Sequence, residues 1–227
     1  MEKARNSYRG LIENCKRDEV TAVYVIHLSD NFNRFEKFEY AIEVLEGFMD
    51  MMETVREKVG VETNLINAYI GCGEFLKAKA ADEKHRSSNR YLIIQSGRIE
   101  EGLCNYETAI DQYREDINAL LRHGNALQKY PSLSETRLAN SLGLATSLLK
   151  HSTDNEAEAF AIFQLEINHC GASSDDRELI LFRMGIEYRH LNKWDQSIEV
   201  LHQLCLSASR PESTMTPQAN EAMAQTY

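Results

Sequence analysis

Two pairs of side chains in this sequence have the spacing of metal ligands: Glu166 with His169, and Glu199 with His202. Residues three positions apart lie on one face of a helix, so each pair could present a carboxylate and an imidazole to one ion. Two such pairs, with two more glutamates on partner helices, form the dimetal site of some helical bundles. No matching glutamates stand out on the candidate partner helices. A helical-bundle metalloenzyme therefore stays as an alternative, while our main expectation is a protein without enzymatic activity, metal or cofactor.

Other catalytic patterns are missing or fail on geometry. His169 and Cys170 are adjacent, and adjacent helical residues point about 100° apart, so they cannot form a nucleophile–base pair. The stretch Gly71-Cys72-Gly73 lacks the lysine and the preceding strand of a phosphate-binding loop, and it indicates a turn. The five cysteines are odd in number and widely spaced, which favours a reducing compartment over a disulfide framework.

The elements that position these residues are expected to be helices. The chain has 227 residues, 11 glycines and three prolines, Pro131, Pro211 and Pro217. A β-sandwich or barrel needs frequent turn residues, so this composition favours long helices. No apolar run is long enough to cross a membrane, and the net charge of −10 disfavours nucleic-acid binding.

A repeated pattern links the expected helices. It consists of an aromatic, a turn residue, a second aromatic that opens the next helix, and a small residue three positions later, where two helices would cross closely. Tyr69, Gly73, Phe75 and Ala78 match Tyr188, Asn192, Trp194 and Ser197 one for one. The small residues of successive units are Ala41, Ala78, Ala109, Ala157 or Ala159, and Ser197. In the third unit Glu100 stands where an aromatic is expected, and the fourth unit, which holds Leu142 and Gly143, is expected to contain an insertion at 151–155.

This pattern resembles the tetratricopeptide (TPR) repeat, a helix–turn–helix unit. The resemblance implies an all-α, right-handed superhelix of about five degenerate repeats with an extra N-terminal helix. We expect that helix over 1–20, the repeat array over 21–210, and a linker with the first helix of a further repeat over 211–227. The unfinished last repeat predicts that the chain is a fragment of a longer protein. A long linking helix over 105–130 is expected to end at Pro131.

In TPR arrays the first helices line a concave groove, and the resemblance places a set of polar and basic residues there. Asparagine can pair with a peptide backbone, and arginine can hold a carboxylate through two hydrogen bonds. The expected partner is therefore an acidic segment of another protein, in extended or helical form. The nominated residues are Asn33, Arg34, Asn64, Asn67, Gln95, Arg98, Arg137, Asn140, Arg183, Arg189 and His190.

Within this superfamily, Asn67-Ala68-Tyr69 followed by Gly73-Glu74-Phe75 is similar to the LGN/Pins spindle-orientation adaptors. That resemblance implies an adaptor that links cortical G-protein α subunits to a NuMA-type coiled-coil protein and dynein. It also implies a cytoplasmic protein at the cell cortex and spindle. Most units lack the Leu-Gly-Asn signature of that family. Tonsoku-like genome-maintenance scaffolds and kinesin-light-chain-like cargo adaptors have similar repeat lengths and stay as alternatives.

Overall fold

The computed structural model describes residues 19–49, 55–88, 96–122, 131–170, 175–207 and 215–224. All regular secondary structure in this part of the chain is helical, which confirms the predicted all-α class. The α-helices are α2 (Glu19–Arg34), α3 (Phe38–Met49), α4 (Val55–Gly71), α5 (Phe75–Ser88), α6 (Ser96–Gly102), α7 (Tyr106–Arg122), α9 (Pro131–His151), α10 (Glu156–His169), α11 (Asp175–His190), α12 (Trp194–Ser207) and α13 (Met215–Ala224). A short 3-10 helix, η1 (Thr153–Asn155), precedes α10. None of the helices within these ranges is long and apolar enough to cross a bilayer.

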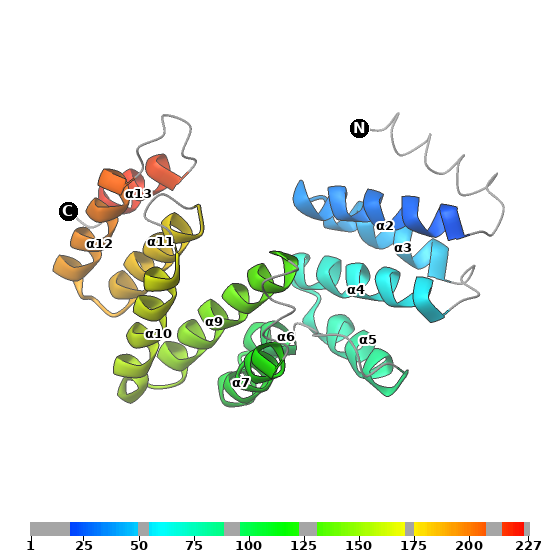
Figure 1. Ribbon diagram of the computed structural model, residues 1–227, viewed down its shortest axis with the longest axis horizontal. Coiled ribbons are helices and arrows are strands. Elements are labelled where there is room, and N and C mark those ends of the chain that lie inside the picture. Colours follow the sequence, from blue (N-terminus) through cyan, green and yellow to red (C-terminus); the bar gives the residue numbers. More distant parts are fainter. Residues whose placement is uncertain are drawn as a thin grey trace. The chain divides into compact units, whose positions relative to one another are not determined.

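Consecutive helices pack in pairs. Helix α2 contacts α3, α4 contacts α5, α9 contacts α10, and α11 contacts α12. Second helices also contact the first helix that follows them, as α3 does α4 among residues 1–105 and α10 does α11 among residues 106–227, so within each of these two parts the pairs stack in chain order (Figure 1). Helix α13 packs on α12 and α11 and so occupies the place of a further first helix.

The second helices all carry a small residue at their fourth position. These residues are Ala41, Ala78, Ala109, Ala159 and Ser197, and each has no exposed surface. In the last pair the hydroxyl of Ser197 donates to the carbonyl of Gly185 on the facing helix, at 2.8 Å. A Cβ added to Gly185 would lie 2.7 Å from the Leu201 side chain. Small residues are therefore needed because the two helices cross within contact of each other's backbone, as the repeat pattern predicted.

Four of the turns inside helix pairs share one backbone geometry. Their central residues, Glu36, Gly73, Cys104 and Asn192, all have positive φ. In the turn after α4, Gly73 N–H donates to Ile70 C=O at 3.0 Å and Glu74 N–H donates to Tyr69 C=O at 2.8 Å. This is the Schellman arrangement, which ends a helix by satisfying its last carbonyls. Only one of the four positions is a glycine, so the other three hold a side chain in a conformation that costs energy.

The structure corrects two expectations about boundaries. Pro131 is the first residue of α9 instead of the end of a long helix, and proline is well suited to that position because its missing N–H would have no partner there. Helix α7 ends at Arg122. The expected N-terminal helix over 1–20 lies outside the described residues, apart from the start of α2.

The fourth repeat needs no insertion. Ser147 is fully buried and precedes the fully buried Ala159 by twelve positions, the same interval that separates Gly185 from Ser197. Ala157 is exposed, which decides between the two candidate small residues. The burial pattern thus places the close crossing at Ser147 and not at Gly143.

The contacts divide the chain into two compact units, residues 1–105 and 106–227. Each has its own apolar core; Leu45, Ile66 and Ile99 are among the buried residues of the first, and Tyr113, Phe163 and Leu201 are among those of the second. In the first unit the repeats fit together through glycines. The Phe38 ring fills the space beside Gly71, where a Cβ would lie 2.4 Å from it, and Phe75 does the same beside Gly102 at 2.1 Å.

Candidate partner-binding surfaces

In the first unit, two of the nominated asparagines connect adjacent first helices. Asn64 on α4 is buried and donates to the Ile26 carbonyl at 3.1 Å and to the Ser29 hydroxyl at 2.9 Å, both on α2. Asn33 on α2 donates back to the Asn64 carbonyl at 3.3 Å. Both hydrogens of the Asn64 amide are therefore used inside the fold, and this side chain stabilises the contact between two repeats.

Three other nominated residues of this unit have accessible side chains. Arg34 at the end of α2 and Arg98 on α6 are exposed, and Asn67 on α4 is half-buried. Gln95 lies outside the described residues. A partner that meets these first helices would therefore find Arg34, Asn67 and Arg98 and not Asn64.

In the second unit, Arg137 is part of an ion pair whose carboxylate is buried. Its guanidinium, on α9, donates to both carboxylate oxygens of Glu166 on α10, at 2.5 and 2.7 Å, and Glu166 is 2% exposed. His169 lies 4.0 Å from the same carboxylate. Asn140 on α9 is also buried, at 2% exposed. These two nominated side chains thus serve the packing of α9.

The same ion pair bears on the metal alternative. Glu166 belongs to the first Glu-x-x-His pair, and both of its oxygens already accept hydrogen bonds from a guanidinium. Within the ranges that the structure describes, no group of three or more histidine, cysteine, aspartate or glutamate side chains is placed to hold a metal ion. The geometry of these residues fits an internal ion pair.

Helix α11 presents the remaining nominated residues. Arg183 and His190 lie one heptad apart and are exposed, and Arg189 is half-buried. Between them Glu187 is buried. Its carboxylate accepts a hydrogen bond from the Thr146 hydroxyl of α9 at 3.5 Å and lies 3.4 Å from the Nδ1 atom of His190. At this end of the helix the accessible charged side chain is therefore that of Arg183, because the Glu187 carboxylate is buried; exposed Asp176 lies one heptad before it.

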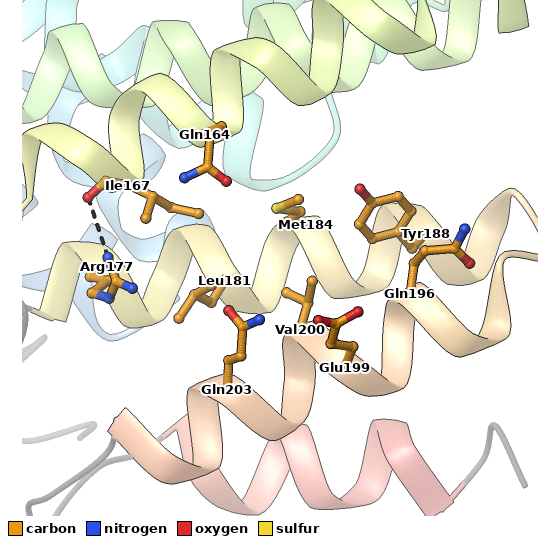
Figure 2. Close-up of a pocket in the computed structure, with 10 residues that line it drawn as sticks. All are labelled: Gln164, Ile167, Arg177, Leu181, Met184, Tyr188, Gln196, Glu199, Val200 and Gln203. Atoms are coloured by element: carbon orange, nitrogen blue, oxygen red, sulfur yellow. Dashed lines mark hydrogen bonds between the residues drawn. The ribbon is translucent and has the colours of Figure 1, made fainter.

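A pocket that the sequence did not predict lies on the other side of α11. Its volume is about 230 Å³, and α10, α11 and α12 line it (Figure 2). The floor is apolar and is made by Ile167, Leu181, Met184 and Val200. Since helical residues turn by about 100° each, Leu181 and Arg183 project from nearly opposite faces of α11. The pocket and the basic residues are therefore two separate surfaces on one helix.

The rim of this pocket is polar. Gln164 stands on the α10 side, and Gln196, Glu199 and Gln203 stand on one face of α12 (Figure 2). Arg177 closes one end and donates to the Ile167 carbonyl at 3.4 Å. The spacing of Gln196, Glu199 and Gln203 along a helix was visible in the sequence, but only packing shows that the row borders a cavity and not open solvent.

The first unit shows how the corresponding space is filled elsewhere. Counting from the small residue of each second helix, Glu46 corresponds to Gln164, and Lys77 corresponds to Gln196. There the Tyr69 hydroxyl donates to Glu46 at 2.6 Å, and the Lys77 ammonium lies 5.6 Å from the Tyr69 ring centre. Burial, together with the bond to Glu46 and its negative charge, raises the pKa of Tyr69.

In the second unit the equivalent tyrosine has a different partner. The Tyr188 ring stacks on Phe160 with the ring centres 4.0 Å apart and the planes at 9°. Burial raises the pKa of the Tyr188 hydroxyl, and the charges of Glu156 and Glu199 add to this, whereas Lys193 opposes it. Tyr188 packs against an aromatic ring, whereas Tyr69 contacts Glu46 and Lys77. The corresponding residues of the second unit, Gln164 and Gln196, line the pocket.

Comparisons with known proteins bear on the fold. No protein-family model matches the chain, and no curated protein matches it. A solved structure of a putative kinesin light chain from "Podosopora anserina", described as having nearly identical TPR-like repeats, matches with a TM-score of 0.57. The match covers 84% of this chain and 96% of that one, at 14% sequence identity. The chain has a TPR-like repeat fold. At this identity the likeness extends to the TPR-like architecture alone, including the helix pairs that carry both surfaces.

Proposed function

We propose that this protein is a non-enzymatic scaffold whose first helices bind a segment of a partner protein. The observation that carries the proposal is the face of α11 on which Arg183 and His190 are exposed one heptad apart. First helices of stacked repeats offer one long surface for such a segment. The proposed partner segment is acidic, since an exposed guanidinium pairs well with a carboxylate.

The first unit supports the same assignment on its own residues. Arg34 and Arg98 are exposed near the ends of two of its first helices, and Asn67 is accessible between them in sequence. A chain of net charge −10 that keeps arginines exposed on these helices can attract an acidic segment locally. Asn64 and Asn140 are left out of the proposed contact set because they are buried, and Arg137 because its guanidinium is bonded to Glu166.

A finer assignment, to a spindle-orientation adaptor of the LGN/Pins type, rests on the stretch that begins at Asn67. Most of that stretch has a role in the fold: Ala68 is fully buried, Gly73 has positive φ, and Phe75 packs beside Gly102. Glu74 pairs with Lys77 at 2.8 Å, so Asn67 is the side chain left to contact a partner. The binding of a NuMA-type protein and a place at the cell cortex and spindle are thus supported by one side chain and by the repeat type.

A kinesin-light-chain-like cargo adaptor is the second candidate. It is favoured by the likeness to the putative kinesin light chain over 84% of the chain, which supports a common repeat architecture. Both candidates are scaffolds that use the first helices, so one experiment tests them together.

Affinity capture with the full-length protein, followed by mass spectrometry, would identify the partner. The Arg183→Glu variant is expected to lose most of the captured partner, because a single charge reversal at a contact turns attraction into repulsion. Arg122→Glu is the matched control, since Arg122 is exposed on a second helix. Equal capture by both variants would contradict the proposed face. A NuMA-type partner would favour the first candidate, and a cargo protein the second.

A further inference from the structure

We propose that the pocket between α10, α11 and α12 is a second protein-binding site, which takes one leucine-sized side chain of a partner segment together with an adjacent lysine or arginine. The site lies on the face of α11 opposite to Arg183, so it does not depend on the proposed function of the first helices. The same protein would then bind an acidic segment on one side and a basic one on the other.

The size of the pocket determines the kind of occupant. At about 230 Å³ it is smaller than the roughly 300–1,000 Å³ of sites that enclose drug-sized ligands and cofactors. Its floor of Ile167, Leu181, Met184 and Val200 offers no polar group. An aliphatic side chain fits this space, because burying it removes apolar surface of both partners from water.

The glutamines around the opening fit a peptide backbone. Gln196 and Gln203 each have an amide that can donate and accept at the same time. Gln164 donates one N–H to Asn168 Oδ1 at 3.2 Å and keeps its second N–H and its carbonyl oxygen. A peptide presents N–H and C=O groups in alternation, and both kinds can be satisfied by such amides. A phosphate would use only the N–H donors of these amides, and a cation would use only their carbonyl oxygens. A rim with both donors and acceptors therefore favours a polypeptide.

Charge at the rim selects the neighbouring residue. Glu199 is the one carboxylate among the lining residues, and the one guanidinium, that of Arg177, lies at the other end of the pocket and donates to the Ile167 carbonyl (Figure 2). A partner lysine or arginine beside the aliphatic residue would meet Glu199. The acidic character of the whole chain, with a net charge of −10, acts in the same direction.

The first unit provides an internal contrast. Its residues at the positions of Gln164 and Gln196 are Glu46 and Lys77, and both interact with Tyr69. In the second unit Tyr188 instead stacks on Phe160, and the polar residues of the rim are not used to hold it. Tyr69 and Tyr188 occupy equivalent positions but have different neighbours. Of the two arrangements, the one around Tyr188 has glutamines beside a cavity.

The test uses ¹⁵N-labelled protein and three blocked hexapeptides as probes: Ac-Ala-Ala-Leu-Lys-Ala-Ala-NH₂, the same peptide with leucine replaced by glycine, and the same peptide with lysine replaced by glutamate. We expect saturable shifts of the side-chain amide signals of Gln164, Gln196 and Gln203 with the first peptide. A Kd of about 1 mM suits so small a contact. The other two peptides are expected to bind at least about tenfold more weakly.

Two variants and a control complete the test. Glu199→Lys should abolish binding of the first peptide through charge, and Val200→Phe should abolish it by filling the floor. Glu115→Lys, an equal charge reversal at an exposed position of α7, should leave binding unchanged. The absence of saturable shifts at these glutamines, equal binding of all three peptides, or unchanged binding by Glu199→Lys would each overturn the proposal. None of these outcomes alters capture through Arg183, so the two proposals fail separately.

Discussion

The guanidinium of Arg137 donates two hydrogen bonds, of 2.5 and 2.7 Å, to the carboxylate of Glu166, which is 2% exposed. This pair joins α9 to α10. It gives both residues a structural role that differs from the roles predicted from the sequence. Arg137 was expected in a partner-binding groove, and Glu166 belongs to a candidate metal-ligand pair. Together they neutralise each other inside a helix pair, because a buried charge requires a partner.

Removing Arg137 alone should destabilise the second unit strongly. Arg137→Met leaves the Glu166 carboxylate buried without a counter-charge, and we expect a loss of about 3–5 kcal/mol in the free energy of unfolding. The double variant Arg137→Met with Glu166→Leu should recover most of this loss. Urea denaturation measures all three proteins. Arg114→Met is the control, because Arg114 and Glu158 form an exposed pair that should contribute only about 0–1 kcal/mol.

Two glycines, one in the turn after α4 and one inside α3, should respond to alanine in opposite directions. Gly73 has φ of +74°, so Gly73→Ala should destabilise the protein by about 1–2 kcal/mol. Gly47 lies inside α3, and a Cβ there would meet no atom within 4 Å. Gly47→Ala should therefore stabilise the protein by about 0.5–1 kcal/mol. Thermal unfolding followed by circular dichroism would show the two shifts, and shifts of the same sign would contradict the turn geometry.

The Tyr69 hydroxyl should make stability fall at high pH. Burial and the bond to Glu46 raise the pKa of Tyr69 in the folded protein. Above about pH 10 the unfolded chain loses a proton that the folded chain keeps, so the free energy of unfolding decreases as pH rises. Tyr69→Phe should cost about 1–3 kcal/mol at neutral pH and should flatten this alkaline decrease. Urea midpoints on both sides of pH 10 measure the effect; an equal alkaline slope in both proteins would contradict it.

Glu100 should have the corresponding effect at low pH. Burial alone would raise the pKa of its carboxyl group, but hydrogen bonds from Lys79 and Asn105 outweigh burial and lower it. The stabilisation is therefore present above the ordinary pKa of glutamate and is lost as pH falls through the lowered value. Glu100→Gln should cost about 1–3 kcal/mol at about pH 7 and little at about pH 3. Urea denaturation at the two pH values measures this difference. Glu101→Gln, the same exchange at the neighbouring position, is the control.

Helical spacing predicted much of the fold because it depends on local chemistry. A small residue three positions after an aromatic marks a close helix crossing wherever it occurs, and Ala78 and Ser197 were assigned correctly on that basis. The fourth repeat was misaligned because its turn has no glycine and its second helix opens with Glu156. The structure aligns it through the burial of Ser147 instead.

Side-chain function was harder to predict than position. Asn64, Arg137 and Arg183 all stand on first helices, and their residue types suit a peptide groove equally well. Packing separates them: Asn64 bonds to α2, Arg137 bonds to Glu166, and Arg183 is exposed. Which neighbour a polar side chain meets depends on helices far along the chain, and the spacing within one helix does not contain that information.

The sequence by itself determined that this protein is a stack of helix pairs, since periodicity, small residues and turn residues act over a few positions. Only the tertiary structure decided which polar residues are exposed on α11 and that glutamines of α10 and α12 border one pocket with aliphatic residues in its lining. Those features arise where three helices meet, and the space left between them depends on how Tyr188 packs on Phe160. Burial and cavity shape are properties of several elements together, and for that reason they appear only when the chain is folded.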